Sequence, residues 1–135
     1  MTKLYIFTNI FPLYRKPLWQ EVLNSESLNA TFHYTENNPL GIKEGFFEED
    51  FLQKKIVKIN SLWFSSKFIY WQFGVLFRCL LHKYDSILFL GEMNILSYWI
   101  GALICRIRKK RVYFWSHGFY GNESSFKYFF RKLFY

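Results

Sequence analysis

The chain has few of the residue types that build small cross-linked or metal-bound domains. Among its 135 residues there are two cysteines, Cys79 and Cys105, and three histidines. The cysteines are far apart, each within an apolar helix-like segment, and no histidines are paired at metal-ligand spacing. This argues against a disulfide framework or a zinc site. It favours two small core thiols in a reducing cytoplasm.

Glycine-rich phosphate motifs are missing as well. The seven glycines form no G-x-G-x-x-G after the first expected strand and no G-x-x-x-x-G-K-[ST], and no serine stands in a G-x-S-x-G. These absences argue against the common dinucleotide sites, P-loops and hydrolase elbows.

Long apolar runs are also lacking. The N-terminus shows no apolar region followed by a cleavage site, so we expect no signal peptide. From Ser86 to Cys105 twenty residues carry one charge, Glu92, but a G-E-M-N sequence divides this stretch. A carboxylate near a bilayer centre is costly, which disfavours a spanning helix and a small integral membrane protein.

Acidic residues are scarce in the second part of the chain. Residues 51–135 carry 14 Lys or Arg against 3 Asp or Glu, whereas residues 1–50 carry 4 against 7. The basic part therefore suits an anionic partner such as nucleic acid, phospholipid head groups or phosphorylated sugars. With 51% hydrophobic and 24% aromatic residues, the chain has enough apolar material for one folded domain.

Strand-like and helix-like segments alternate along the chain. Unbroken apolar runs predict strands at residues 3–8, 30–35, 56–59, 85–90 and 112–115. Helices are expected to begin at Pro17, at Ser65 or Ser66, at Asn94 and at Ser124. In the third of these helices one apolar face is shared by Leu96, Trp99, Ile100, Leu103 and Ile107. The pattern predicts an α/β fold, a Rossmann-like parallel sheet with helices on both faces.

Polar residues and glycines follow the first, fourth and fifth expected strands. They are Asn9, Tyr14 and Arg15; Glu92 and Asn94; and Ser116, His117, Gly118, Tyr120 and Gly121. Carboxyl ends of parallel strands share one edge of a sheet, where ligands bind, so we expect these residues to converge. Each also has a simpler interpretation: His117 as a turn residue, Glu92 as a solvated carboxylate, Arg15 as a surface charge and the glycines as turn formers. For His33 and His82 a structural role is preferred.

Three segments resemble family 4 retaining glycosyltransferases with the GT-B fold. They are N-I-F-P-x-Y-R-x-P-L-W after the first strand, Y-D-S-I-L-F-L-G-E, and K-R-V-Y-F-W-S-H-G-F-Y-G. The closest likeness is to bacterial enzymes of surface-polysaccharide synthesis. It covers most of residues 3–135, all within the family's N-terminal, acceptor-binding domain. Many members have a glycine pair after the first strand, where this chain has Leu13-Tyr14-Arg15.

The resemblance implies transfer of a sugar from a nucleotide-sugar donor to a glycan or lipid-linked acceptor, without metal or cofactor. His117 matches the histidine beside the transferred sugar and is the expected catalytic residue. The other nine residues of the three loops are the expected substrate contacts. The family's C-terminal donor-binding domain has no counterpart, so residues 1–135 are expected to form a single incomplete domain, inactive alone and with an exposed apolar surface.

The same resemblance implies a cytoplasmic enzyme, peripheral at the inner face of the plasma membrane. An anionic membrane surface is an expected partner, through an amphipathic helix in which Lys127, Arg131 and Lys132 alternate with phenylalanines. That helix could equally pack its aromatic face on the sheet. The alternative function is a non-catalytic basic module for nucleic acid or membrane, although no motif indicates specific nucleic-acid binding.

Overall fold

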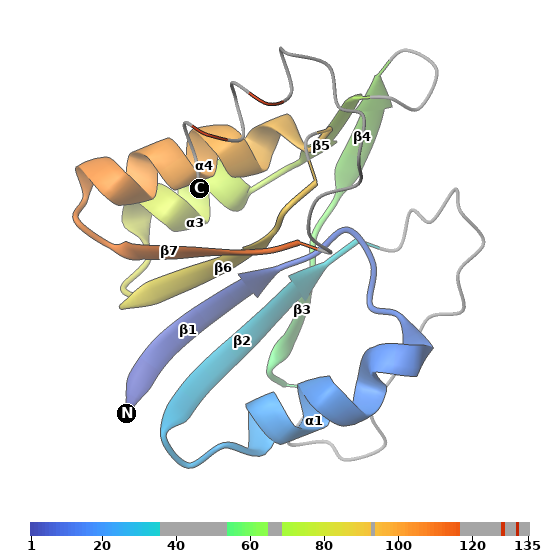
Figure 1. The fold of residues 1–135 in the computed structure, drawn as a ribbon, viewed down its shortest axis with the longest axis vertical. Helices are drawn as coiled ribbons and strands as arrows, with labels where there is room; N and C mark the ends of the chain where they lie inside the picture. The colour runs from blue at the N-terminus through green and yellow to red at the C-terminus, as the bar shows by residue number, and fades with distance from the viewer. Residues whose placement is uncertain (36–53, 65–68, 93, 117–127, 129–131, 133–135) are drawn as a thin grey trace.

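A computed structural model describes residues 1–35, 54–64, 69–92, 94–116, 128 and 132. Its centre is a five-stranded parallel sheet in the order β3-β2-β1-β6-β7 (Figure 1). The strands are β1 (Thr2–Phe7), β2 (Leu28–Tyr34), β3 (Ile56–Lys58), β6 (Ser86–Leu90) and β7 (Arg111–Trp115). The prediction of a Rossmann-like parallel α/β fold is therefore confirmed for this part of the chain.

The central strands are apolar because helices cover both faces of the sheet. β1 pairs with β2 on one side and with β6 on the other, and Phe7 is opposite Phe89 in the second pairing. These two rings stack with their centroids 5.5 Å apart. Consecutive residues of a strand face opposite sides, so Ile6 packs beneath one helical layer and Phe7 beneath the other.

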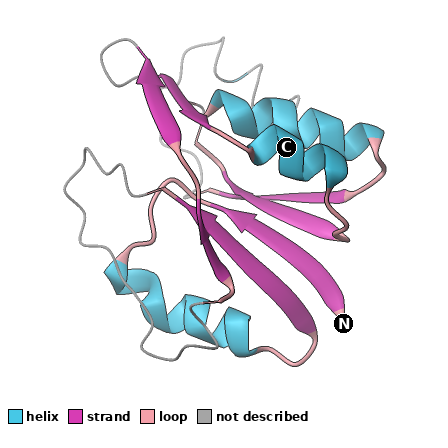
Figure 2. Cartoon of the chain, turned by 180° about the vertical axis from the view of Figure 1, so that it is seen from behind, coloured by secondary structure: helices cyan, strands magenta, loops and turns pink. Residues whose placement is uncertain are grey.

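One face of the sheet is covered by α1 (Lys16–Asn24), which follows the short 3-10 helix η1 (Leu13–Arg15) (Figure 2). Pro17 lies in the first turn of α1, where a missing N–H costs nothing. Trp19 and Leu23 are turned inward and buried.

The other face is covered by α3 (Val75–Leu81) and α4 (Leu96–Ile107), which lie side by side (Figure 2). Small residues line their contact: a Cβ on Gly101 would lie only 3.2 Å from Cys79 Sγ and from Phe89 Cζ. Both thiols are buried and free, which confirms their role as small core residues.

The helix expected to begin at Ser65 or Ser66 is present only in its second part, as α3, so its predicted start is wrong. Instead, β4 (Ser61–Phe64) and β5 (Ile69–Gln72) form an antiparallel pair, and the helix starts only at Val75. Aromatic residues fit the pleated strand pair, with Trp63 paired to Tyr70. Gly74, at φ 80°, then turns the chain in a conformation that favours glycine.

Two predictions for α4 are also corrected. Asn94 does not cap the helix, which begins at Leu96 without a side-chain cap. The predicted apolar face points mostly away from the sheet: Ile107 is 74% exposed and Leu103 52% exposed. The buried face consists of Ser97, Tyr98, Gly101, Ala102 and Cys105. Periodicity identified the stripe but not the side on which it lies.

The described helices include none long and apolar enough to cross a membrane. Apart from Tyr128 and Lys132, the helix expected after Ser124 lies outside the described residues.

Candidate functional site

The chain changes direction across the sheet between β1 and β6. From β1 it passes through α1 on one face to β2, whereas from β6 it passes through α4 on the other face to β7 (Figure 1). The loops after β1 and β6 therefore diverge at the carboxyl edge of two adjacent strands. In open α/β sheets this switch point is where ligands bind.

Asn9 and Glu92 meet at the switch point, as their positions in the sequence predict. The Asn9 Nδ2 amide donates a hydrogen bond to Glu92 Oε2 at 3.4 Å. Asn9 is 9% exposed, and its carbonyl oxygen accepts a hydrogen bond from Thr35 N, directly after β2, which holds Asn9 in place. Glu92 is exposed. The pair presents a carboxylate to solvent beside a fixed amide.

Tyr14 and Arg15 lie on the loop that leaves β1, against the end of β7. The Arg15 guanidinium carbon is 5.3 Å from the centre of the Tyr14 ring and 5.5 Å from that of the Trp115 ring. Trp115 also packs on Trp19 of α1, at 5.4 Å between ring centres. These contacts join the first loop to the end of β7, so a cation lies at the same edge as Asn9 and Glu92.

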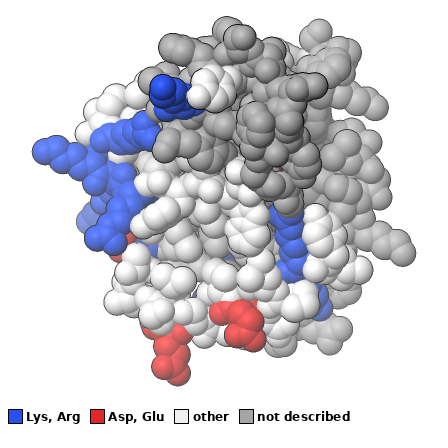
Figure 3. All heavy atoms as spheres, in the orientation of Figure 1, with Lys and Arg blue, Asp and Glu red and all other residues white. Residues whose placement is uncertain are grey.

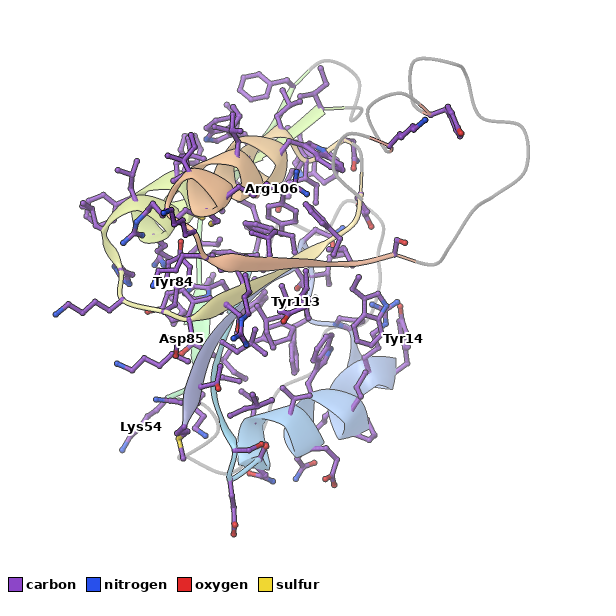
Figure 4. The ribbon with its side chains drawn as sticks, turned by 60° about the vertical axis from the view of Figure 1, so that its left-hand side comes forward. Tyr14, Lys54, Tyr84, Asp85, Arg106 and Tyr113 are labelled. Atoms are coloured by element: carbon purple, nitrogen blue, oxygen red, sulfur yellow. The ribbon has the colours of Figure 1, made fainter. Side chains whose placement is uncertain are left out.

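The convergence of the first, fourth and fifth strand ends is thus confirmed for the described residues. β6 and β7 are neighbours, with Leu90 opposite Trp115, and exposed Ser116 follows directly. Figure 4 shows Tyr14 at this carboxyl edge and Asp85 and Lys54 at the opposite edge. His117, Gly118, Tyr120 and Gly121 lie outside the described residues, so their predicted roles remain predictions.

A buried polar cluster that the sequence did not predict supports this edge from below. Gln72 of β5 is fully buried, and its Nε2 donates to the Thr8 carbonyl and to Thr35 Oγ1, each at 2.6 Å. Thr35 Oγ1 is also hydrogen bonded to the Tyr70 hydroxyl. Gln72 thereby ties the ends of β1 and β2 together one residue from Asn9. A lone glutamine inside the apolar run I-Y-W-Q-F was the available signal.

The α4 side of the cluster adds two hydroxyls. Ser97 Oγ accepts a hydrogen bond from Gln72 N at 3.2 Å. Tyr98 is fully buried, and burial, with smaller effects of Tyr70 and Glu92, raises its pKa well above 10. Tyr98 therefore stays neutral at physiological pH.

Asn94 does not join this group through an observed side-chain contact. It is half-buried, and its carbonyl oxygen accepts a hydrogen bond from Tyr70 N at 2.8 Å, which fastens the loop after β6 to the hairpin. Across the ranges that the structure describes, no three His, Cys, Asp or Glu side chains gather to hold a metal ion.

Comparison with protein-family models, curated proteins and solved structures finds no match to this chain. The likeness to glycosyltransferases therefore rests on the three sequence segments, and the case for a site rests on the geometry at the switch point.

Proposed function

We propose that this chain is the acceptor-binding part of a retaining glycosyltransferase with the GT-B fold. The observation that carries the proposal is the meeting of Asn9 and Glu92 at the switch point, on the same edge of the sheet as Arg15 and the end of β7, which His117 follows in the sequence. The sequence likeness supplies the reaction, and the parallel sheet agrees with a Rossmann-like half of such an enzyme.

The reaction breaks the bond between the anomeric carbon of the donor sugar and a diphosphate oxygen. It forms a bond from that carbon to an acceptor hydroxyl oxygen and releases the nucleoside diphosphate, whose leaving oxygen takes up the hydroxyl proton. In the proposal, Glu92 accepts a hydrogen bond from an acceptor hydroxyl while Asn9 holds the carboxylate in position. Arg15 places positive charge near the diphosphate, and His117 lies beside the transferred sugar.

The test is nucleoside diphosphate release by the protein expressed from its complete coding sequence. A panel of UDP- and GDP-sugars is supplied with lipid-linked acceptor from membrane extract. His117→Ala should lower turnover about 100- to 1,000-fold. Glu92→Gln should lower kcat/KM for the acceptor about 10- to 100-fold, because a charged hydrogen-bond acceptor is lost.

Lys54→Ala, at the opposite edge of the sheet, is the matched control and should change neither constant (Figure 4). Circular dichroism spectra that superpose with wild type show that each variant folds. Release by His117→Ala and Glu92→Gln at the wild-type rate would contradict the proposed site, and absence of release with every donor would contradict the proposed reaction.

A further inference from the structure

The outward faces of α3 and α4 carry an unusual number of large aliphatic and aromatic side chains. On α4 they recur at every third or fourth position and thus form one stripe, and on α3 they occupy the last two turns. Together they form the α3–α4 surface, which consists of Phe77, Leu80, Leu81, Leu96, Ile100, Leu103 and Ile107. Each of them is between 43% and 74% exposed.

The position of the α3–α4 surface argues against covering by additional strands. A further strand would add beside β7 or β3, the two outermost strands in the described order, and would therefore lie in the plane of the sheet. The stripe of α4 lies on the side of the helix turned away from the sheet, where Ile107 and Leu103 are exposed. Cys105 and Ala102, on the opposite side, are buried. Contiguous exposed apolar patches of this kind mark interaction sites.

Cations gather at one end of the α3–α4 surface. Between Val75 and Arg111 the sequence has seven Lys or Arg and two acidic residues. One of the two, Glu92, lies at the far, carboxyl edge, and the other, Asp85, accepts a hydrogen bond from Lys3 N at 2.8 Å. Figure 3 shows the basic side chains together on the flank where α3 and α4 end and β7 begins.

The turn between α4 and β7 fixes this basic end. The Arg108 guanidinium carbon lies 5.7 Å and Lys110 Nζ 5.6 Å from the centre of the Tyr84 ring, and Arg108 donates a hydrogen bond to the Cys79 carbonyl. Lys83, before Tyr84, and Lys109, in the turn, are exposed. The basic end is therefore built by segments that α3 and α4 bring together.

We propose that the α3–α4 surface and its basic end dock on an anionic lipid bilayer, with both helices lying along the interface. Aliphatic side chains enter the boundary of head groups and acyl chains while Lys and Arg bind the lipid phosphates. The phosphates of a nucleic acid would match the cations. Its bases, however, stack on aromatic side chains, and six of the seven apolar side chains of this surface are aliphatic. A second copy docked through the same face would bring like charges together.

This inference does not depend on the proposed reaction, and its test needs no donor sugar. The full chain is sedimented with phosphatidylcholine vesicles and with vesicles containing 30% phosphatidylglycerol at about 50 mM salt. Wild type should pellet with the anionic vesicles and remain in solution with the neutral ones. Soluble wild type in both arms would overturn the proposal.

Two double variants, each with a matched control, test whether vesicle binding depends on the α3–α4 surface and its basic end. Leu103→Gln/Ile107→Gln should weaken vesicle binding about tenfold or more, whereas Leu13→Gln/Leu18→Gln, on the α1 side, should not. Lys83→Glu/Lys109→Glu should likewise cost about tenfold or more, and Lys54→Glu/Lys58→Glu, with the same change of net charge, less than about threefold. Light scattering checks that each variant is monomeric and circular dichroism that it is folded.

Equal losses in a variant and its matched control would overturn the assignment to α3 and α4. A dimer of wild type that Leu103→Gln/Ile107→Gln converts to monomer, without vesicle binding, would show that the partner is a second copy. Pelleting by an RNA-coated resin but not by anionic vesicles would show a nucleic-acid surface instead.

Discussion

The two faces of the sheet are packed by different kinds of residue. On the α1 face the buried cluster is Ile6, Phe11, Trp19, Leu23, Ala30 and Phe32. On the α3–α4 face the buried residues include three tyrosines and both cysteines, with His33 stacked on Phe7 at 4.5 Å. The aliphatic residues of α1 point mostly inward, whereas those of α4 point mostly outward.

This difference shows that an apolar stripe indicates the buried side of a helix only when the opposite side is polar. α1 has charged and amide side chains opposite Trp19 and Leu23. α4 has tyrosine, cysteine, alanine and glycine opposite Leu103 and Ile107, and these pack against a sheet equally well. Close approach of small residues determines the orientation of α4.

Among these substitutions, the largest loss of folding stability should come from truncating Trp19, on the α1 face. Trp19→Ala removes a buried indole that contacts Phe32 and Trp115, so the free energy of unfolding should fall by about 3–5 kcal/mol. Leu18→Ala, one residue earlier and 42% exposed, should cost less than about 1 kcal/mol. Urea unfolding measures both, and similar losses would mean that α1 does not pack as described.

The close contact of α3 and α4 should be sensitive to volume. Gly101→Val places methyl groups against Cys79, Val75 and Phe89, and should cost about 1–3 kcal/mol through overpacking. Leu103→Val, two residues away and exposed, should stay within about 0.5 kcal/mol. Thermal unfolding of the two variants tests this, and a Gly101→Val protein as stable as wild type would refute the close packing.

His33 should make the α3–α4 face sensitive to acid. Burial, with the nearby charge of Arg78, lowers its pKa from 6.5 to about 3. Because the pKa is lowered on folding, the unfolded chain takes up the proton first, and stability is lost as pH falls from 6.5 toward 3. This histidine alone should cost about 1 kcal/mol between pH 6 and pH 5.

The measurement is urea unfolding of wild type and His33→Phe at both pH values. Phenylalanine keeps the stack on Phe7 and removes the titrating group. The loss of stability on acidification should therefore be smaller in His33→Phe by about 1 kcal/mol. Equal losses in the two proteins would show that His33 is not held neutral.

The smallest effect should come from the outer stripe of α4. Ile107→Gln should change the free energy of unfolding by less than about 0.5 kcal/mol, because Ile107 is 74% exposed. Leu23→Ala, at a fully buried position of α1, should cost about 2–5 kcal/mol. A large loss of unfolding free energy in Ile107→Gln would show that Ile107 packs against another part of the chain.

Sequence patterns were sufficient for the parallel sheet, since apolar strand segments alternate with helical ones along the chain. They were also sufficient for the meeting of Asn9 with Glu92, since the strand ends of a parallel sheet share an edge. They were insufficient for the β4–β5 hairpin, because L-W-F and I-Y-W-Q-F suit a strand or a buried helix equally well. Gln72 supports Asn9 through its hydrogen bond to the carbonyl of Thr8, which is 64 positions away in the sequence. No local sequence pattern indicates a contact over such a separation.

The central position of β1 also has a consequence during synthesis. Residues 2–7 leave the ribosome early, yet one edge of this strand can be paired only when residues 86–90 follow. At about 5–20 residues per second that delay lasts about 4–16 seconds. For this time the nascent chain carries an unpaired Tyr-Ile-Phe edge, which is the kind of segment that chaperones shield.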